Sequence, residues 1–160
     1  MKQQCPIEVP LNNPKNKKPG KLVLEKFVDY EKPTFMDYIR GGLQLNLSVA
    51  IDFTASNGTP TANTSLHFLD PYKPNQYQMA IMAVGNILLN YDYDKMIPAF
   101  GFGAKPNFPQ LRSPTTDHCF PLSGRYDIIE AAGLEGLMAM YANSLQNVSL
   151  SGPTYFAPIL

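Results

Sequence analysis

The chain has 160 residues, of which 44% are hydrophobic and 16% are charged, so it is long enough to bury the core of a soluble globular domain. Its 13 basic and 13 acidic residues give a formal net charge of zero, which excludes a global electrostatic attraction to nucleic acid or to an anionic membrane surface. We therefore expect no nucleic-acid partner.

The cysteines and the N-terminal residues indicate a cellular compartment. Cys5 and Cys119 lie far apart and show no metal-ligand spacing, which favours a reducing, cytoplasmic environment. No apolar signal core follows Met1, and no apolar run approaches the length of a membrane span. A cytoplasmic protein is the simplest interpretation.

The first 42 residues contain one predicted strand. Residues 1–20 are rich in Pro, Asn and Lys without periodicity and are predicted to form a loop. Residues 21–30 show partial alternation of apolar and polar side chains, which predicts a strand. A lone strand is unstable, so it must join a sheet formed by other residues. Residues 31–42 are predicted to be a linker, which ends in two glycines.

A strand followed by a helix comes next in the chain. The apolar run 49–51 is typical of a strand buried on both faces, and it ends at Asp52. After a polar stretch, four side chains recur at the spacing of one helix face, and Asn75 is a plausible N-cap for a helix that closes near residue 90. These four are Tyr77, Ile81, Val84 and Leu88.

The strand-then-helix order is repeated in the C-terminal third. Residues 96–104 predict a second buried strand, although Pro98 argues against a central position in a sheet. Residues 105–123 are proline-rich and mostly irregular, with a possible short strand at 118–120. Residues 134–145 predict a second helix.

This element order defines the expected fold. The segment before the second helix, 125–133, is predicted to be partly helical. The order strand–helix–strand–helix predicts an α/β fold with a right-handed crossover and a parallel sheet. Two confident strands make a poor sheet, so we expect the sequence to be cut short after Leu160.

Three oxygen-bearing side chains follow the first buried strand in a D-x-T-x-S pattern. Asp52, Thr54 and Ser56 come at the carboxyl end of that strand, where open α/β sheets bind ligands. Hard oxygen donors without imidazole or thiolate suit Mg²⁺, Mn²⁺ or Ca²⁺ rather than zinc. A plain alternative is that Asp52 caps the following turn, which Asp, Thr and Ser all do readily.

The two histidines give no second metal pattern. His67 and His118 are far apart and have no partnering cysteine or carboxylate motif. Both are predicted to be packing or surface residues.

Four blocks of the sequence resemble the copine family. They are Phe-Met-Asp-Tyr-Ile-Arg-Gly-Gly at 35–42, Val-Ala-Ile-Asp-Phe-Thr-Ala-Ser-Asn-Gly at 49–58, the segment 91–104, and Gly-Pro-Thr-Tyr-Phe-Ala-Pro-Ile at 152–159. The blocks occur in the family's order and with similar spacing, and the resemblance covers roughly residues 20–160.

The resemblance implies a division into domains. Copines carry calcium-dependent lipid-binding β-sandwich modules followed by a von Willebrand factor A-like domain. Residues 1–31 would be the C-terminal remnant of such a module, and 32–42 would be a linker. Residues 43–160 would be the N-terminal half of the A-like domain, a Rossmann-like α/β fold truncated after about half of its sheet.

The resemblance also implies a metal-ion-dependent adhesion site. Its first loop corresponds to Asp52, Thr54 and Ser56, with threonine replacing a serine but keeping the hydroxyl, and its second-loop threonine corresponds to Thr154. The third-loop aspartate is expected beyond Leu160, so we expect the divalent cation, Mg²⁺ or Mn²⁺, to bind weakly here. The calcium ions of the lipid-binding modules would bind outside this chain.

A non-enzymatic function follows from the resemblance. The A-like domain would bind protein partners with the help of the divalent ion. The parent protein would bind anionic membranes through modules absent from this chain, and it would move from the cytoplasm to the plasma membrane when calcium rises.

Two alternatives remain. Asp52 could be the nucleophile of an aspartyl-phosphate phosphotransferase, although Thr54 and Phe53 stand where such enzymes usually carry a second Asp or a Lys. Copine-like plant ubiquitin ligases share the A-type domain, but their zinc-binding RING has closely spaced cysteines, which Cys5 and Cys119 do not supply.

Overall fold

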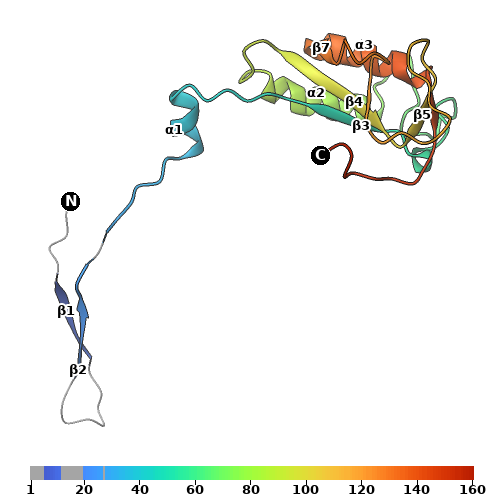
Figure 1. Ribbon diagram of the computed structural model, residues 1–160. Helices are drawn as coiled ribbons and strands as arrows, with labels where there is room; N and C mark the ends of the chain where they lie inside the picture. Colours follow the sequence, from blue (N-terminus) through green and yellow to red (C-terminus); the bar gives the residue numbers. More distant parts are fainter. Residues whose placement is uncertain (1–5, 12–19, 27) are drawn as a thin grey trace. The chain divides into compact units, whose positions relative to one another are not determined.

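Figure 1 shows the computed structural model, which describes residues 6–11, 20–26 and 28–160. The chain forms two compact units, Met1–Gly42 and Leu43–Leu160. The assignment of these units to a lipid-binding module, a linker and an A-like domain stays a prediction.

The first unit contains an antiparallel hairpin. Strands β1 (Ile7–Leu11) and β2 (Gly20–Leu24) pair with Val9 opposite Leu22. None of these ten residues is buried. A two-stranded hairpin is at best marginally stable in water, so its apolar side chains offer a surface for further packing.

Three predictions for this unit need correction. The loop expected over residues 1–20 is wrong at Ile7–Leu11, which forms β1, while residues 1–5 and 12–19 lie outside the described part. The strand expected over 21–30 ends at Leu24. The expected linker contains helix α1 (Phe35–Arg40), whose N-cap Thr34 forms a capping box. A six-residue helix is too short to show a clear 3.6-residue period, which explains the omission.

The second unit is built on a mixed sheet around β4 (Figure 1). Strand β3 pairs with β4 in parallel, as the strand–helix–strand order predicts. Strands β6 and β7 pair with β4 in the antiparallel sense, so the expectation of a purely parallel sheet is wrong. The bounds are Val49–Asp52 for β3, Met96–Phe102 for β4, Phe120–Pro121 for β6 and Glu130–Ala132 for β7.

Strand β4 is central despite its proline. Pro98 lies opposite Glu130 of β7, and the ladder with β3 begins one residue later, at Ala99 opposite Val49. The missing N–H of proline therefore leaves the parallel ladder intact. The expectation from Pro98 of a non-central strand is wrong, because β4 pairs with β3, β6 and β7.

A second, two-stranded sheet was not predicted. Strand β5 (Ala104–Pro106) pairs antiparallel with β8 (Val148–Leu150). The strand expected over 96–104 is therefore interrupted at Gly103, which adopts a φ of +74°. The segment 125–133, expected to be partly helical, contributes strand β7 instead.

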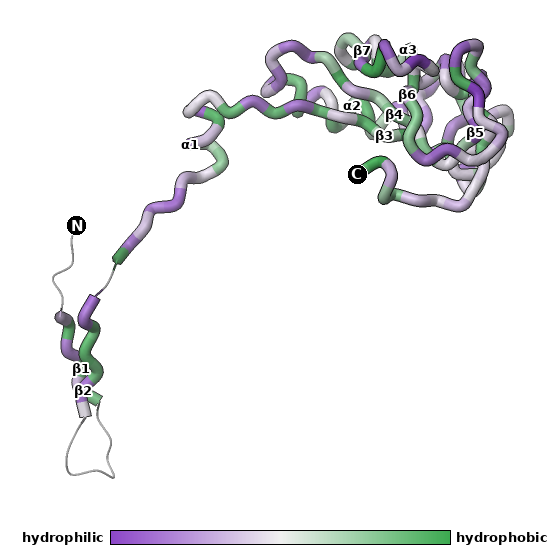
Figure 2. Tube along the Cα trace, in the orientation of Figure 1, coloured by the Kyte–Doolittle hydropathy of each residue, from purple (hydrophilic) through white to green (hydrophobic). Residues whose placement is uncertain are grey.

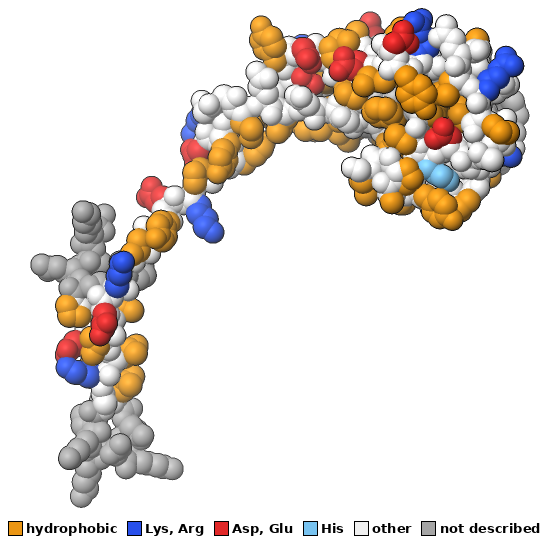
Figure 3. Space-filling model, viewed as in Figure 1, with side chains coloured by type: hydrophobic (Ala, Val, Ile, Leu, Met, Phe, Trp, Pro, Cys, Tyr) orange, Lys and Arg blue, Asp and Glu red, His pale blue; other side chains and the backbone are white. Residues whose placement is uncertain are grey.

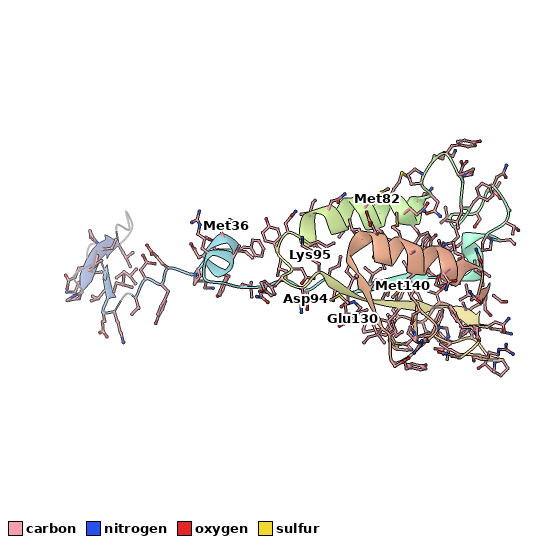
Figure 4. The ribbon with its side chains drawn as sticks, turned by 90° about the horizontal axis from the view of Figure 1, so that it is seen from above. Met36, Met82, Asp94, Lys95, Glu130 and Met140 are labelled. Carbon is pink, nitrogen blue, oxygen red and sulfur yellow. The ribbon has the colours of Figure 1, made fainter. Side chains whose placement is uncertain are left out.

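Both predicted long helices are confirmed. Helix α2 (Gln76–Leu88) begins at the predicted N-cap Asn75, and helix α3 spans Gly133–Leu145. The two helices lie side by side in Figure 4. A Cβ at Gly85 of α2 would overlap the side chain of Leu134, which shows how closely the helices approach.

The core lies between these helices and the mixed sheet, and hydrophobic stretches follow the central strands in Figure 2. Val84, expected on the inner face of α2, is half exposed, and Gly85 takes the buried place. Fully buried core side chains include Phe53, Ile97, Phe120, Leu137 and Tyr141.

Within the described residues, no helix has the length and apolarity needed to cross a membrane.

Candidate metal site

The candidate site begins where β3 ends. Asp52 is the last residue of the strand, and the backbone N–H of Thr54 donates to its Oδ1 at 2.8 Å. The Thr54 hydroxyl donates to the same oxygen. These are the hydrogen bonds that the turn-capping interpretation of Asp52 requires, so that role is present irrespective of any metal.

Thr154 reaches the same place from the other end of the domain. Its hydroxyl oxygen lies 2.8 Å from that of Thr54. The backbone brings them together, because Ser151 forms a parallel bridge with Thr54 and its carbonyl accepts from the N–H of Ala55 at 2.6 Å. Ser151 is anchored in turn by its own N–H, which donates to the Gly103 carbonyl at 3.0 Å.

Ser56 is the predicted ligand that these hydrogen bonds do not include. It lies in the short 3₁₀ helix Ala55–Asn57, and its side chain is exposed. Within the described residues its hydroxyl makes no hydrogen bond. Asp52 and Thr154 are therefore joined through the Thr54 hydroxyl, and Ser56 takes no part in these hydrogen bonds.

The donor set fits a hard divalent cation. It comprises one carboxylate and neutral hydroxyls, all oxygen, which suits Mg²⁺ or Mn²⁺. Asp52 Oδ2 has no hydrogen-bond partner among the described residues, so one carboxylate oxygen is free. The described part of the chain holds no cluster of three His, Cys, Asp or Glu side chains suited to a metal. Any cation here would depend on hydroxyls, water and one further acidic ligand.

Three side chains that sequence reasoning did not connect to this site surround the Asp52 backbone carbonyl. His67 Nε2 lies 2.9 Å from the carbonyl oxygen, and the Tyr77 hydroxyl and the Asn57 amide nitrogen each lie 3.1 Å from it. The sequence signalled Tyr77 only as part of a helix face. His67 and Asn57 gave no sign of this contact.

His67 is a buried packing residue, as predicted. Its ring stacks on Tyr77 with centroids 4.2 Å apart and lies 5.2 Å from the ring of Phe53. A carbonyl oxygen only accepts hydrogen bonds, so Nε2 carries the proton and Nδ1 accepts from the Tyr141 hydroxyl at 2.9 Å. Burial lowers the pKa of His67, which favours the neutral ring.

His118 is also a packing residue. It is half-buried, and its ring centroid lies 4.8 Å from that of Tyr155 in the C-terminal segment. Its Nδ1 is buried without a hydrogen-bond partner among the described residues.

Exposed hydrophobic side chains gather on the visible face of the second unit, Leu43–Leu160 (Figure 3).

The geometry describes an α/β domain with an oxygen-lined strand end, and comparison with known proteins gives the family. The Copine family model matches residues 65–160. That range includes Thr154 and lies after Asp52, Thr54 and Ser56.

Curated relatives agree with the family match. Protein BONZAI 1 of Arabidopsis thaliana is 47% identical over 142 residues, which cover 88% of this chain and 24% of that protein. Nicotinic receptor-associated protein 1 of Caenorhabditis elegans is 46% identical over 130 residues, or 81% of this chain and 20% of that protein. The chain belongs to the copine family, as its four sequence blocks predicted. It spans about a quarter of the length of these relatives.

Proposed function

We propose that residues 43–160 belong to a Rossmann-like, von Willebrand factor A-type domain that binds protein partners with the help of a divalent cation. Asp52, Thr54, Ser56 and Thr154 are the proposed ligands. The observation that supports this proposal best is the meeting of Asp52, Thr54 and Thr154 at the end of β3, across 100 residues of sequence.

The chemistry of these residues explains how partners would be chosen. A divalent cation would supply an open coordination position and positive charge for an acidic side chain of a partner. The hydroxyls of Thr54 and Thr154 are neutral, so they leave that charge largely uncompensated. Asp52 provides the one anionic oxygen of the set. A partner carboxylate is therefore favoured over a neutral or basic group.

The longer protein supplies the remaining functions in this proposal. Calcium-dependent modules would bind anionic membranes and bring the protein from the cytoplasm to the plasma membrane. Copine-family relatives suggest a non-enzymatic role, and the name of the Caenorhabditis elegans relative describes association with a receptor. That name supports binding of protein partners. The comparisons add no support for a phosphotransferase or a ubiquitin ligase.

Paramagnetic Mn²⁺ and amide NMR test the metal site. We expect Mn²⁺ to broaden the signals of residues 53–57, 151, 152 and 154 selectively, at concentrations that indicate weak binding. Asp52→Asn keeps an oxygen that can cap the turn but removes the charge, so it should abolish this broadening. Asp70→Asn is a matched control, because Asp70 Oδ1 accepts from the N–H of Tyr72 at 2.8 Å in a similar turn.

The two variants separate the metal role from turn capping. Broadening that survives in Asp52→Asn, or that centres on other residues, would leave Asp52 as a turn cap only. Equal loss in the Asp70 variant would indicate nonspecific attraction of the cation to acidic side chains.

A further inference from the structure

We propose that His67 is a positioning residue for the metal site, which it serves by holding the backbone carbonyl of Asp52 in place. The inference rests on the proposed function, because Asp52 is the acidic ligand of that site. It assigns a role to a buried histidine that packing alone does not explain.

The Asp52 carbonyl lies on the unpaired edge of β3. The next residue, Phe53, donates its N–H to Phe102 of β4 at 2.9 Å, so it faces β4. Successive residues of a strand direct their backbone groups to opposite edges, and the Asp52 carbonyl therefore points away from β4. Within the described residues, β3 pairs with β4 alone. Side chains occupy the place of a neighbouring strand at this position.

The donors around the Asp52 carbonyl exceed what burial requires. A backbone carbonyl has two lone pairs, and a single hydrogen bond satisfies it in most folded proteins. Here His67 Nε2–H and the Asn57 amide both donate to the Asp52 oxygen, at 2.9 and 3.1 Å. The Tyr77 hydroxyl also lies 3.1 Å from this oxygen, and its single proton is shared with Asn57 Oδ1, 2.9 Å away. The excess of donors points to restraint of the peptide rather than to simple compensation for burial.

The orientation of the His67 ring is determined by a directed chain of hydrogen bonds. The Asn75 amide, at the N-cap of α2, donates to the Tyr141 hydroxyl of α3 at 3.1 Å. Tyr141 donates to His67 Nδ1 at 2.9 Å, and His67 Nε2–H donates to the Asp52 carbonyl at 2.9 Å. Stacking against Tyr77 restricts ring rotation. Both helices thus contribute to the position of the strand end.

Asn57 extends the same restraint to the second predicted ligand. Its amide group donates to the carbonyls of Asp52 and Thr54, each at 3.1 Å. The backbones of both residues are therefore held by one side chain, while the Thr54 hydroxyl contacts both Asp52 Oδ1 and Thr154. A small rotation of the Asp52 peptide would separate these oxygens.

Three substitutions test the inference in the 160-residue chain with Mn²⁺ as the probe. His67→Phe keeps the ring stack but removes both hydrogen bonds, and we expect Mn²⁺ to bind about tenfold more weakly, as for other residues that orient metal ligands. His67→Gln restores a side-chain N–H donor and should recover much of the affinity. Leu137→Ala is the control, because Leu137 is fully buried in α3, one turn before Tyr141, and its side chain takes part in no hydrogen bond, so the variant opens a cavity there without removing any member of the hydrogen-bond chain.

Each outcome decides the question. Unchanged Mn²⁺ affinity in folded His67→Phe would overturn the proposal, and so would an equal loss of affinity in Leu137→Ala, since that loss would reflect general destabilisation. If His67→Phe does not fold, Tyr141→Phe replaces it. That variant removes the donor to His67 Nδ1 together with the acceptor of the Asn75 amide, and it should also weaken Mn²⁺ binding.

A measurement without metal separates this inference from the proposed function. The ¹⁵N signals of the imidazole should identify the Nε2–H tautomer, and the ¹³C shift of the Asp52 carbonyl should move in His67→Phe far more than in Leu137→Ala. If these shifts appear but Mn²⁺ does not bind, the metal function fails and the restraint stands. An Nδ1–H tautomer or an unmoved carbonyl shift would refute the restraint itself.

Discussion

The hydroxyl oxygens of Thr54 and Thr154 lie 2.8 Å apart, although 100 positions separate them in the sequence. Thr54 lies 8% exposed at the end of β3, whereas Thr154 is exposed in the segment that follows β8. This contact joins the second and the last of the four predicted ligands of the metal site. Of the two residues, Thr154 is therefore open to solvent, whereas Thr54 is shielded by the domain.

Thr154 should contribute its hydroxyl to cation binding rather than its methyl group. Thr154→Val keeps the shape but removes the oxygen, and we expect selective Mn²⁺ broadening near residues 53–57 to be lost. Thr154→Ser keeps the hydroxyl and should retain the broadening. Equal behaviour of the two variants in an Mn²⁺ titration would remove Thr154 from the ligand set.

Gly103 should tolerate no side chain beside Thr54. Its φ is +74°, and a Cβ there would lie 2.7 Å from Thr54 Oγ1, so Gly103→Ala combines backbone strain with a clash. We expect it to lower the free energy of unfolding by about 1 to 3 kcal/mol, measured by urea denaturation. Gly133→Ala is the control, because Gly133 also has a positive φ, +62°, but a Cβ added there would meet nothing within 4 Å. A loss in Gly133→Ala as large as in Gly103→Ala would mean that the clash contributes nothing.

Asn75 should stabilise the domain in two separable ways. Its side chain accepts from the N–H of Gln78 at 2.9 Å as an N-cap, and its amide donates to Tyr141. Asn75→Ala removes both interactions and should cost about 0.5 to 2 kcal/mol of unfolding free energy or more. Asn75→Ser keeps a capping oxygen and should recover the capping part alone. Full recovery by serine would show that the bond to Tyr141 adds no stability.

Cys119 should be a slow nucleophile at neutral pH. Burial, with a smaller effect of the negative charge of Asp117, raises the pKa of its thiol. Only the thiolate reacts, so the rate of alkylation should rise at higher pH than in the unfolded chain. Mass spectrometry of the Cys119 peptide after iodoacetamide treatment at a series of pH values measures this. Asp117→Asn should move the profile to lower pH, and a wild-type profile at or below that of the unfolded chain would contradict the prediction.

Local sequence patterns were sufficient for the strand that ends at Asp52 and for both long helices. An apolar run, a helical repeat and the N-cap Asn75 act within a few neighbouring residues, so they can be recognised without knowing the fold. The copine assignment likewise came from four sequence blocks and agrees with the family match. The D-x-T-x-S pattern placed the candidate site at the end of β3, where Asp52, Thr54 and Thr154 meet.

Other elements could not be predicted because their partners are remote in sequence. Strands β5 and β8 have three residues each, which is too short for a periodic signal, and they exist as strands because they pair with each other. The helical expectation for 125–133 failed for the same reason, since β7 is defined by pairing with β4.

By itself the sequence determined the family, the main helices and which oxygen-bearing residues to examine, since these depend on residue type and near-neighbour spacing. Only the tertiary structure decided that Thr154 meets Thr54, that Ser56 makes no such contact, and that His67 holds the Asp52 carbonyl. Those contacts join residues 15 to 100 positions apart, and their geometry arises from the packing of helices and strands rather than from any local preference of the chain.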